Sequence, residues 1–453
     1  MIAAKPKEAY KWAALLSKAT ESLRICLAFL VLLAGCGSKL PTLSPTLHPV
    51  GTPAPTTRPA SPPTDTPVSK PTTPEATPTQ TPPSLVGPLV VGSYADFQVQ
   101  AAIPVYDLGT RRSVPLPFSR PANTVFIEDW SPDGCQLIVS PKPSGQVASY
   151  LLNVVTLEVE PFTIQAYDSM LYSPDGEWLA YVDDQGDDSP RPGNVYLLNI
   201  DGSKHVQLTD DAKRHRLDSW SHDSLKVLYW TQQQGSPGNG TQELRAVNIH
   251  TREQCVIARF HEPLSQWEDL YLADVDSCRQ ISLPYSGSLE KAAYVGLIYS
   301  PGHRYVAIIL EPIGGGGDFV IYGRLFLLDT KTKNVYPVGD GGMYLSNFLA
   351  WSPDGTILVL VATFDGQTEN GPVYLVNAET GSIQALDIES AYAPSWSPDG
   401  QMLAFQSTTP DKGPFIYYPQ TKEVVDLPIG FGDYMMGPLL WSPRMSYNPE
   451  ACR

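Results

Sequence analysis

The pentapeptide Trp396-Ser397-Pro398-Asp399-Gly400 decides the fold, because closely similar peptides recur along the chain. The other copies are Trp130–Gly134, Tyr172–Gly176, Trp220–Asp223, Tyr299–Gly302, Trp351–Gly355 and Trp441–Pro443. From the copy at Trp130 onward, the first residues of successive copies are spaced by 42, 48, 79, 52, 45 and 45 residues. A repeat of roughly this period indicates a propeller or a solenoid. The 44 Pro and 35 Gly argue further against a helical bundle, because both residues weaken helix interiors.

Each copy has the chemistry of a tight turn between two strands, since Pro presets the turn and Asp-Gly tolerates a left-handed backbone. A strand in which polar and apolar residues alternate follows the turn, as in Gln401–Phe405. Each repeat also has a second hairpin, as in Val373–Asn377, with a short polar turn. Each repeat therefore predicts four strands, here called A, B, C and D. The repeated Trp are interpreted as packing residues between blades. The repeated acidic residues are interpreted as turn residues that bond their own backbone: Asp133, Asp175, Asp354 and Asp399.

The repeat resembles that of TolB-type, WD-like β-propellers over essentially all of residues 87–453. This resemblance implies an all-β fold, and it leaves the function open because such propellers have many roles. Counting the copies predicts seven blades. Leu89–Ser93 has the pattern of a B strand with no A strand before it, and Pro438–Trp441 that of an A strand with no full blade after it. We therefore expect a strand from the C-terminus to close the ring.

The 79-residue interval contains an additional strand-like segment, Leu270–Asp274. We interpret it as an extra hairpin on one blade, and a degenerate eighth blade is the alternative. Cys255 and Cys278 fall at similar D-strand positions of the two hairpins, so a disulfide between them would tie the extra hairpin to its blade. The other two cysteines of residues 87–453, Cys135 and Cys452, are expected to pair and to lock the ring near its seam. Two other pairings of the four cysteines are possible, and buried free thiols are the alternative. Disulfides of this kind persist in exported proteins.

The first 35 residues have the pattern of an export signal. Basic residues precede the apolar run Ile25–Leu33, which is too short to span a bilayer as a helix. The run ends in Leu33-Ala34-Gly35-Cys36, which resembles a bacterial lipobox. The resemblance implies lipid attachment at Cys36 and a location at the bacterial cell envelope, exported and anchored to the membrane surface. A plain secretory signal with an incidental cysteine is the alternative.

Residues 36–86 are expected to form a disordered stalk that carries the lipidated cysteine at its start. Residues 37–86 contain 14 Pro and 12 Thr, a composition that cannot bury a core. The domain boundaries are therefore 1–35 for the signal, 36–86 for the linker and 87–453 for the propeller.

The charge is acidic and unevenly distributed. The whole chain carries −16, while residues 1–36 carry +3 and residues 37–86 carry +1, so residues 87–453 carry −20. This balance argues against nucleic acid as a partner, because phosphate binding needs Lys and Arg. It favours a cationic partner, or it serves only to keep a monomeric protein soluble.

The long connections are expected to share one face of the ring. They follow B strands, as at Asp183–Gly193, Gln232–Thr241 and Glu311–Tyr322, whereas the A–B turns are uniformly tight. Long loops on a rigid scaffold are where binding usually occurs. We therefore expect a module that binds a protein, peptide or glycan through this face, and the candidate residues are Asp183, Asp184, Arg214, His215, Asp318 and Asp365.

An enzyme acting in the central channel, either a polysaccharide lyase or a hydrolase, is the alternative function. Only His215, placed between strands D and A, is expected near that channel. No Gly-x-Ser-x-Gly elbow occurs, and the A strands have an apolar pattern, which favours binding over catalysis. No pair of His or Cys suggests a metal site or another cofactor. The acidic segment Asp183–Asp188 has ligands for Ca²⁺ but departs from EF-hand spacing, so a solvated loop is favoured.

Overall fold

The structure is a computed structural model that describes residues between 85 and 452, with gaps. The described ranges are 85–92, 94–96, 102–118, 124–142, 149–162, 170–183, 193–200, 203–211, 213–232, 240–284, 288–312, 316–317, 320–346, 349–363, 372–388, 391–409, 412–427, 437–447 and 449–452. The expected signal, Cys36 and nearly all of the expected stalk lie outside them.

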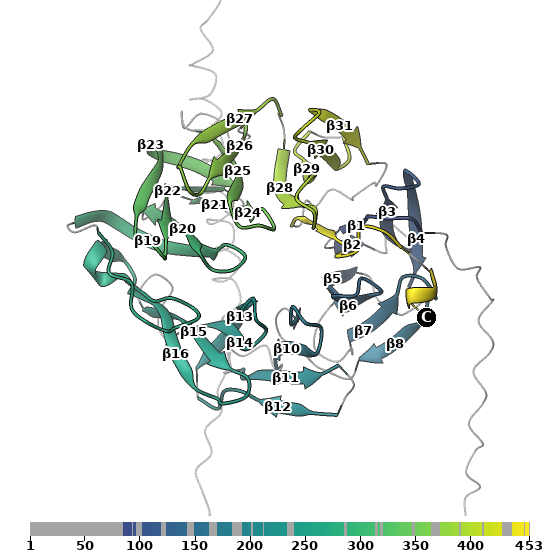
Figure 1. Ribbon diagram of the computed structural model, residues 1–453, viewed down its shortest axis with the longest axis horizontal. Helices are drawn as coiled ribbons and strands as arrows, with labels where there is room; N and C mark the ends of the chain where they lie inside the picture. Colours follow the sequence, from purple (N-terminus) through teal and green to yellow (C-terminus); the bar gives the residue numbers. More distant parts are fainter. Residues whose placement is uncertain are drawn as a thin grey trace, which may run out of the picture. The chain divides into compact units, whose positions relative to one another are not determined.

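Seven antiparallel blades surround a common axis (Figure 1), as the repeat predicts. Blade 1 consists of β32 (Leu439–Trp441), β1 (Leu89–Gly92), β3 (Ala102–Asp107) and β4 (Arg112–Pro117). Blade 2 consists of β5 (Thr124–Trp130), β6 (Gln136–Lys142), β7 (Ser149–Asn153) and β8 (Val159–Phe162), and β2 (Tyr94–Asp96) pairs with β5. Blade 3 consists of β9 (Leu171–Tyr172), β10 (Trp178–Val182), β11 (Val195–Asn199) and β12 (His205–Gln207).

The remaining four blades follow the same order from the axis outward. Blade 4 consists of β13 (Arg214–Trp220), β14 (Lys226–Gln232), β15 (Thr241–Asn248) and β16 (Gln254–His261). Blade 5 consists of β19 (Ser288–Tyr299), β20 (Tyr305–Pro312), β22 (Val320–Asp329) and β23 (Val335–Ser346). Blade 6 consists of β24 (Ala350–Trp351), β25 (Ile357–Thr363), β26 (Val373–Asn377) and β27 (Ile383–Leu386). Blade 7 consists of β28 (Ala391–Trp396), β29 (Leu403–Ser407), β30 (Phe415–Tyr418) and β31 (Glu423–Asp426).

The A–B turns are built by the side chains that the repeat supplies. The Ser131 hydroxyl donates to Asp133 Oδ1 at 2.6 Å, and the same carboxylate oxygen accepts the N–H of Cys135 at 3.0 Å. Ser131 Oγ also accepts the N–H of Gln136 at 2.8 Å. The same Ser–Asp bond recurs in blades 3, 4, 6 and 7. The repeated carboxylates are therefore turn residues, as expected.

In five of the seven blades a tryptophan opens the A–B turn and joins its blade to the preceding one, while Tyr172 and Tyr299 occupy this position in blades 3 and 5. The indole N–H of Trp351 donates to the carbonyl of Ile298 in β19 at 3.1 Å, and that of Trp396 donates to Ala350 in β24 at 3.2 Å. Equivalent bonds start from Trp130, Trp220 and Trp441. Each acceptor lies in the innermost strand of the preceding blade. Seven hydrophobic clusters accompany these bonds, one at each junction between neighbouring blades.

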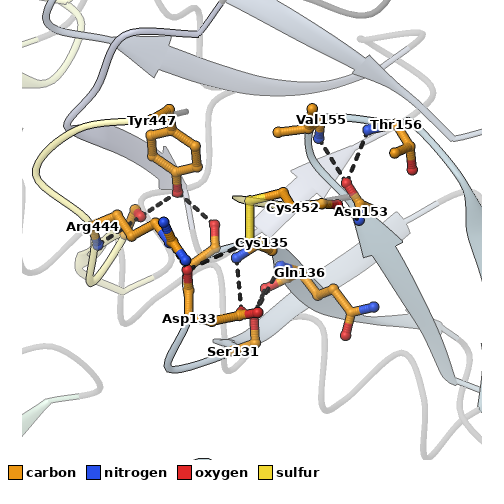
Figure 2. Close-up of a disulfide and its surroundings, with 12 residues drawn as sticks. Ser131, Asp133, Cys135, Gln136, Asn153, Val155, Thr156, Arg444, Tyr447 and Cys452 are labelled. Atoms are coloured by element: carbon orange, nitrogen blue, oxygen red, sulfur yellow. Dashed lines mark hydrogen bonds between the residues drawn. A yellow bond between two sulfur atoms is a disulfide. The ribbon is translucent and has the colours of Figure 1, made fainter. Parts of the chain in front are cut away.

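The ring closes with the C-terminal strand. β32 pairs with β1 in the register Val90↔Trp441, so the innermost strand of blade 1 comes from the opposite end of the chain. Cys452, in the 3₁₀ turn η2 (Pro449–Cys452), is disulfide-bonded to Cys135, with a Cα–Cα distance of 5.3 Å. Figure 2 shows this seam, where the Tyr447 hydroxyl donates to the carbonyl of Gly134 at 2.6 Å. The expected closure and this expected pairing are both present.

The 79-residue interval adds strands to existing blades and does not form an eighth one. β18 (Tyr271–Leu272) pairs with β16 as a fifth strand of blade 4. β17 (Leu264–Gln266) pairs instead with β19 of blade 5, and the 3₁₀ turn η1 (Trp267–Asp269) separates the two strands. The expected Cys255–Cys278 disulfide is present. The expected D-strand position of Cys278 is wrong, because this residue follows a turn and has a left-handed φ of 58°.

The B–C and D–A connections leave the ring on one side, which we call the loop-rich face, and the A–B and C–D turns leave on the other. This follows from the antiparallel order of strands within each blade. The expected extent of one connection, Glu311–Tyr322, is wrong. β20 continues to Pro312, β22 begins at Val320, and β21 (Gly316–Gly317) pairs with β22.

The two disulfides provide a test of ring closure. We compare the double variant Cys135→Ala/Cys452→Ala with Cys255→Ala/Cys278→Ala by thermal and urea-induced unfolding. The chain-entropy relation gives about 3.4 kcal/mol for the pair separated by 23 residues and about 5.7 kcal/mol for the pair separated by 317. The seam variant should therefore lose more stability. An equal or smaller loss would contradict the role of the Cys135–Cys452 bond in holding the ring closed.

Candidate functional site at the junction of blades 3 and 4

The innermost strand of blade 4 begins on the loop-rich face. Arg214, the first residue of β13, pairs with Gln232, the last residue of β14, after which the B–C connection of this blade starts. The other end of β13, at Trp220, adjoins the tight turn at Ser221. β13 lies next to the ring axis in Figure 1. Its first residues therefore occupy the inner rim of the loop-rich face.

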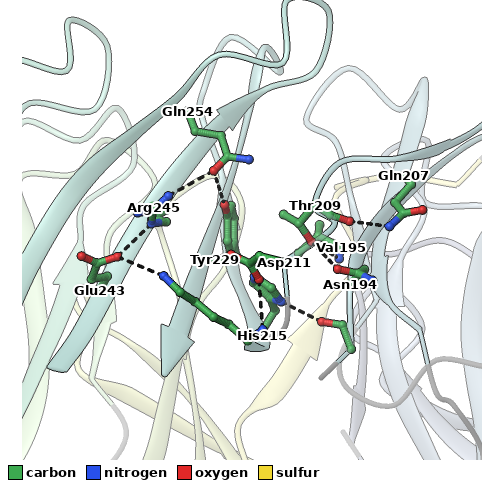
Figure 3. A network of polar contacts seen from close by, with 12 residues as sticks. Asn194, Val195, Gln207, Thr209, Asp211, His215, Tyr229, Glu243, Arg245 and Gln254 are labelled. Carbon is green, nitrogen blue, oxygen red and sulfur yellow. Dashed lines mark hydrogen bonds and ion pairs between the residues drawn. The ribbon is translucent and has the colours of Figure 1, made fainter. Parts of the chain in front are cut away.

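His215 is the second residue of β13 and points toward blade 3. Its Nδ1 donates to the carbonyl of Gly193 at 2.7 Å, which places the proton of the neutral ring on Nδ1. Its Nε2 lies 3.2 Å from Asp211 Oδ1, without the alignment of a hydrogen bond. Burial lowers the pKa of His215, against the opposing effects of the Gly193 carbonyl and Asp211. Figure 3 shows the ring enclosed between these groups and Tyr229.

Glu243, in β15, is surrounded by three cations on the side of blade 4 that faces blade 3. Arg259 Nε donates to Glu243 Oε1 at 2.6 Å, and Arg245 Nε donates to Oε2 at 2.9 Å. Lys213 Nζ lies 3.9 Å from the same carboxylate. Burial alone would raise the pKa of Glu243, but the hydrogen bonds from Arg245 and Arg259 outweigh it and lower the pKa. The carboxylate is therefore charged, and the cations around it outnumber it.

A second part of this network links three strands within blade 4, β14, β15 and β16 (Figure 3). The Tyr229 hydroxyl donates to Gln254 Oε1 at 3.1 Å, and Arg245 Nη1 donates to the same oxygen at 3.2 Å. In blade 3, the Thr209 hydroxyl donates to Asn194 Oδ1 at 3.2 Å. The junction thus has an ordered polar layer on the loop-rich side of its apolar core.

Two buried carboxyl groups lie on innermost strands outside this network. Burial raises the pKa of Asp129 to about 7, although its oxygens accept the backbone N–H groups of Trp130 and Tyr172. Burial also raises the pKa of Asp218, which accepts from the indole of Trp230 at 2.8 Å. Perturbed carboxyl groups can mark functional sites, but the hydrogen bonds of both groups are used to hold the fold.

The structure brings together half of the residues proposed from the sequence. Asp183, Arg214 and His215 all lie at the loop-rich end of the junction between blades 3 and 4, where the N–H of Asp183 donates to the carbonyl of Asn194. The other three candidates, Asp184, Asp318 and Asp365, fall outside the described residues.

Two expectations about this region are wrong. His215 lies within strand A rather than between strands D and A, and its side chain is 0% exposed, so it does not face the axis of the ring. The innermost strands are also not uniformly apolar, since β13 carries Arg214, Arg216 and Asp218. Lys213 and Arg216 were not among the residues proposed from the sequence. The available signal was the run Lys213-Arg214-His215-Arg216 in an acidic chain.

Among the described residues, no group of three His, Cys, Asp or Glu side chains is placed to hold a metal ion. The acidic segment considered for Ca²⁺ lies, beyond Asp183, outside the described part of the chain. No helix in the described ranges is long and apolar enough to cross a membrane.

Comparison with known proteins finds similarity of fold. No protein-family model and no curated protein matches the chain. An oligogalacturonate lyase from Vibrio parahaemolyticus is 16% identical, with a TM-score of 0.49, over 75% of this chain and 86% of that chain. TolB from Acinetobacter baumannii is 16% identical, with a TM-score of 0.41, over 76% of this chain and 79% of that chain. The seven blades agree with the TolB-type propeller that the repeat resembles. At these identities and TM-scores, neither likeness carries an argument about activity or partner.

The burial of His215 predicts a pH-dependent contribution to stability. Because its pKa is lowered in the folded protein, the unfolded chain binds the proton first as the pH falls. This contribution is fully present above the ordinary pKa of 6.5 and declines below it. His215→Asn keeps a donor for the Gly193 carbonyl but does not titrate. Unfolding at about pH 7.5 and about pH 5.5 should show a smaller pH effect than in the wild type, and a stability about 1–3 kcal/mol lower at the higher pH.

The matched control is His250→Asn in an exposed turn, which should keep the wild-type pH profile. An unchanged profile in His215→Asn would contradict the assignment of His215 as a buried, neutral ring.

Proposed function

We propose that this chain is a lipid-anchored module of the bacterial cell envelope that binds a protein, peptide or glycan through its loop-rich face. The observation that carries the proposal is the ordered polar layer at blades 3 and 4, which lies toward that face and includes Lys213, directly before β13. A rigid ring with polar groups fixed at the base of its loops is the arrangement that recognition uses.

Binding is favoured over catalysis by the state of the titratable groups. A general acid or base must lie within hydrogen-bond reach of its substrate. The side chain of His215 is 0% exposed. Asp129 and Asp218 are each committed to two donors. A lyase or hydrolase acting at the axis of the ring would therefore need other residues, and we place this alternative second.

The proposal of a lipid anchor is supported by the sequence. The Leu33-Ala34-Gly35-Cys36 segment supports acylation of Cys36, and the Pro- and Thr-rich linker supports a tether between the lipid and the propeller. A single chain in the membrane and a rigid ring at the end of a tether suit capture of a partner that lies away from the membrane surface.

Site-specific photocrosslinking in cells tests the binding face. A photoreactive residue replaces Asp210 or Lys412 on the loop-rich face, or Glu177 or His222 at A–B turns on the opposite face; all four positions are exposed. We expect Asp210 and Lys412 to capture a discrete partner at several-fold higher yield than the other two. Capture mainly from Glu177 and His222 would place the interface on the face of the A–B turns and would contradict binding through the loop-rich face.

Replacement of the proposed anchor tests the location. Cys36→Ser should move the protein from the membrane fraction to the soluble fraction and abolish incorporation of labelled fatty acid. Cys26→Ser, in the apolar run, is the matched control and should leave both unchanged. Retention of Cys36→Ser in the membrane together with the fatty-acid label would rule out lipid attachment at Cys36.

A further inference from the structure

The two disulfides that the structure describes lie in opposite environments. Cys135 and Cys452 are 3% and 6% exposed and belong to the apolar cluster between blades 1 and 2. Cys255, in β16, and Cys278 are both partly exposed. Disulfide exchange requires access of a thiol to sulfur, and exposed disulfides are the labile ones. The Cys255–Cys278 bond is therefore the more accessible of the two.

Cys278 lies in a hairpin turn whose geometry recurs in the propeller. Its N–H donates to the carbonyl of Asp274 at 2.8 Å, and its φ is 58°. The C–D turns of blades 2, 4, 5 and 7 have the same bond and the same left-handed φ, at Leu157, Arg252, Lys333 and Lys422. The last three of these side chains are exposed. This position of the turn thus lies at the surface of a blade, where a partner can approach Cys278.

Lys226 places an ammonium group against Cys278. Its Nζ donates to the carbonyl of Val275 at 2.8 Å and to that of Asp276 at 2.5 Å, and it lies 4.0 Å from Cys278 Sγ. Lys226 is the first residue of β14, so blade 4 itself positions the ammonium. A positive charge beside a cysteine stabilises its thiolate.

Two carboxylates are also in electrostatic contact with Lys226, those of Asp223 and Asp274. Each accepts a hydrogen bond from a serine hydroxyl of its own turn, at 2.6 Å in both cases. Neither forms an ion pair with Lys226 among the described contacts. Because Coulomb energy decreases with distance, the ammonium in contact with Cys278 acts directly on a charge at that sulfur.

The extra hairpin is held to its blade by more than the disulfide. Leu272, Val275 and Ile281 are buried in the apolar cluster between blades 4 and 5. β18 also pairs with β16. Apolar burial therefore keeps the hairpin docked when the bond between Cys255 and Cys278 opens, so the bond can be reduced and formed again without unfolding of the blade.

We propose that the Cys255–Cys278 disulfide is a thiol–disulfide exchange site, in which Lys226 stabilises Cys278 as the departing thiolate. The partner is a dithiol reductant of the Cys-x-x-Cys class. The site lies on the face of the A–B turns, since Lys226 directly follows that turn in blade 4. It leaves the loop-rich face free and does not depend on the proposed binding function.

The exchange is balanced in two steps. A thiolate of the reductant attacks Cys255 Sγ, the bond between the two sulfurs breaks, and the electron pair passes to Cys278 Sγ beside the ammonium. The second thiol of the reductant, as its thiolate, then attacks the mixed disulfide and releases Cys255. The reductant gains a disulfide and loses two protons, and this chain gains two electrons and takes up two protons as its thiols form.

Reduction of the full chain by dithiothreitol compares the two disulfides in one molecule. Free thiols are alkylated at intervals at neutral pH and mapped by mass spectrometry of peptides. We expect Cys255–Cys278 to be reduced about tenfold or more faster than Cys135–Cys452, which is the internal control. Equal rates, or faster reduction of Cys135–Cys452, would overturn the proposal.

Substitution of the ammonium separates its chemical role from a structural one. Lys226→Met should slow reduction of Cys255–Cys278 about threefold or more, whereas Lys226→Arg should stay within about twofold of the wild type. Lys331→Met, in the exposed turn after β22, is the control for loss of a surface charge and should leave the rate unchanged. If Lys226 only held the turn, its loss would loosen the hairpin and speed reduction. An unchanged or faster rate in Lys226→Met therefore refutes its role at Cys278.

A single-cysteine variant identifies the departing sulfur. Cys255→Ser leaves Cys278 as a free thiol, and iodoacetamide at neutral pH should modify it several-fold faster than in Cys255→Ser/Lys226→Met, because only the thiolate reacts. Cooperative thermal unfolding of both variants, followed by circular dichroism, verifies that the ring is folded. Equal alkylation of the two folded variants would show that Lys226 does not stabilise the Cys278 thiolate and would remove the basis of the exchange site.

Discussion

The fold depends on the hydrogen bond between the indole N–H of one blade and an innermost-strand carbonyl of the blade before it. Strands within a blade satisfy one another, whereas backbone pairing between neighbouring blades is limited to a few short contacts, such as that of β23 with β25. Apolar packing alone would therefore leave the angle of most blades to the next weakly defined. The indole of Trp351 combines both roles, because it is buried between blades and its N–H reaches Ile298. The contact recurs at five of the seven junctions, and there it fixes the same relation between neighbouring blades, which lets the ring close.

The sequence predicts this part of the fold well because the repeated residues act locally. Ser131 and Asp133 form their turn within five residues, so the repeat alone indicates both the turn and the strands beside it. The closing strand was predictable for a related reason, since unpaired strands at the two ends of a repeat array have one another as partners. The interval around Leu270 was not predictable in the same detail. Whether β17 pairs with its own blade or the next depends on contacts that the repeat does not encode.

The candidate site shows the same division. The run from Lys213 to Arg216 was visible in the sequence, but its meaning depends on which side chain of each alternating pair faces the next blade. Burial of His215 against Gly193 removes a residue that sequence reasoning placed near the axis, and it turns Arg214 and Arg216 outward. Net charge misleads for a related reason. A net charge of −20 over the propeller does not describe a site where one carboxylate contacts three cations.

The inner rim is where such a site can form with little cost to the ring. Along β13, the side facing blade 3 must fill a core, and Leu217 belongs to that core. At its first residues, the opposite side is exposed, so charged residues there add no burial penalty and do not disturb packing. The polar groups from Glu243 to Tyr229 lie on the blade 3 side of blade 4, as His215 does. The alternation of β13 thus separates the buried contacts of blade 4 from the exposed side of its innermost strand.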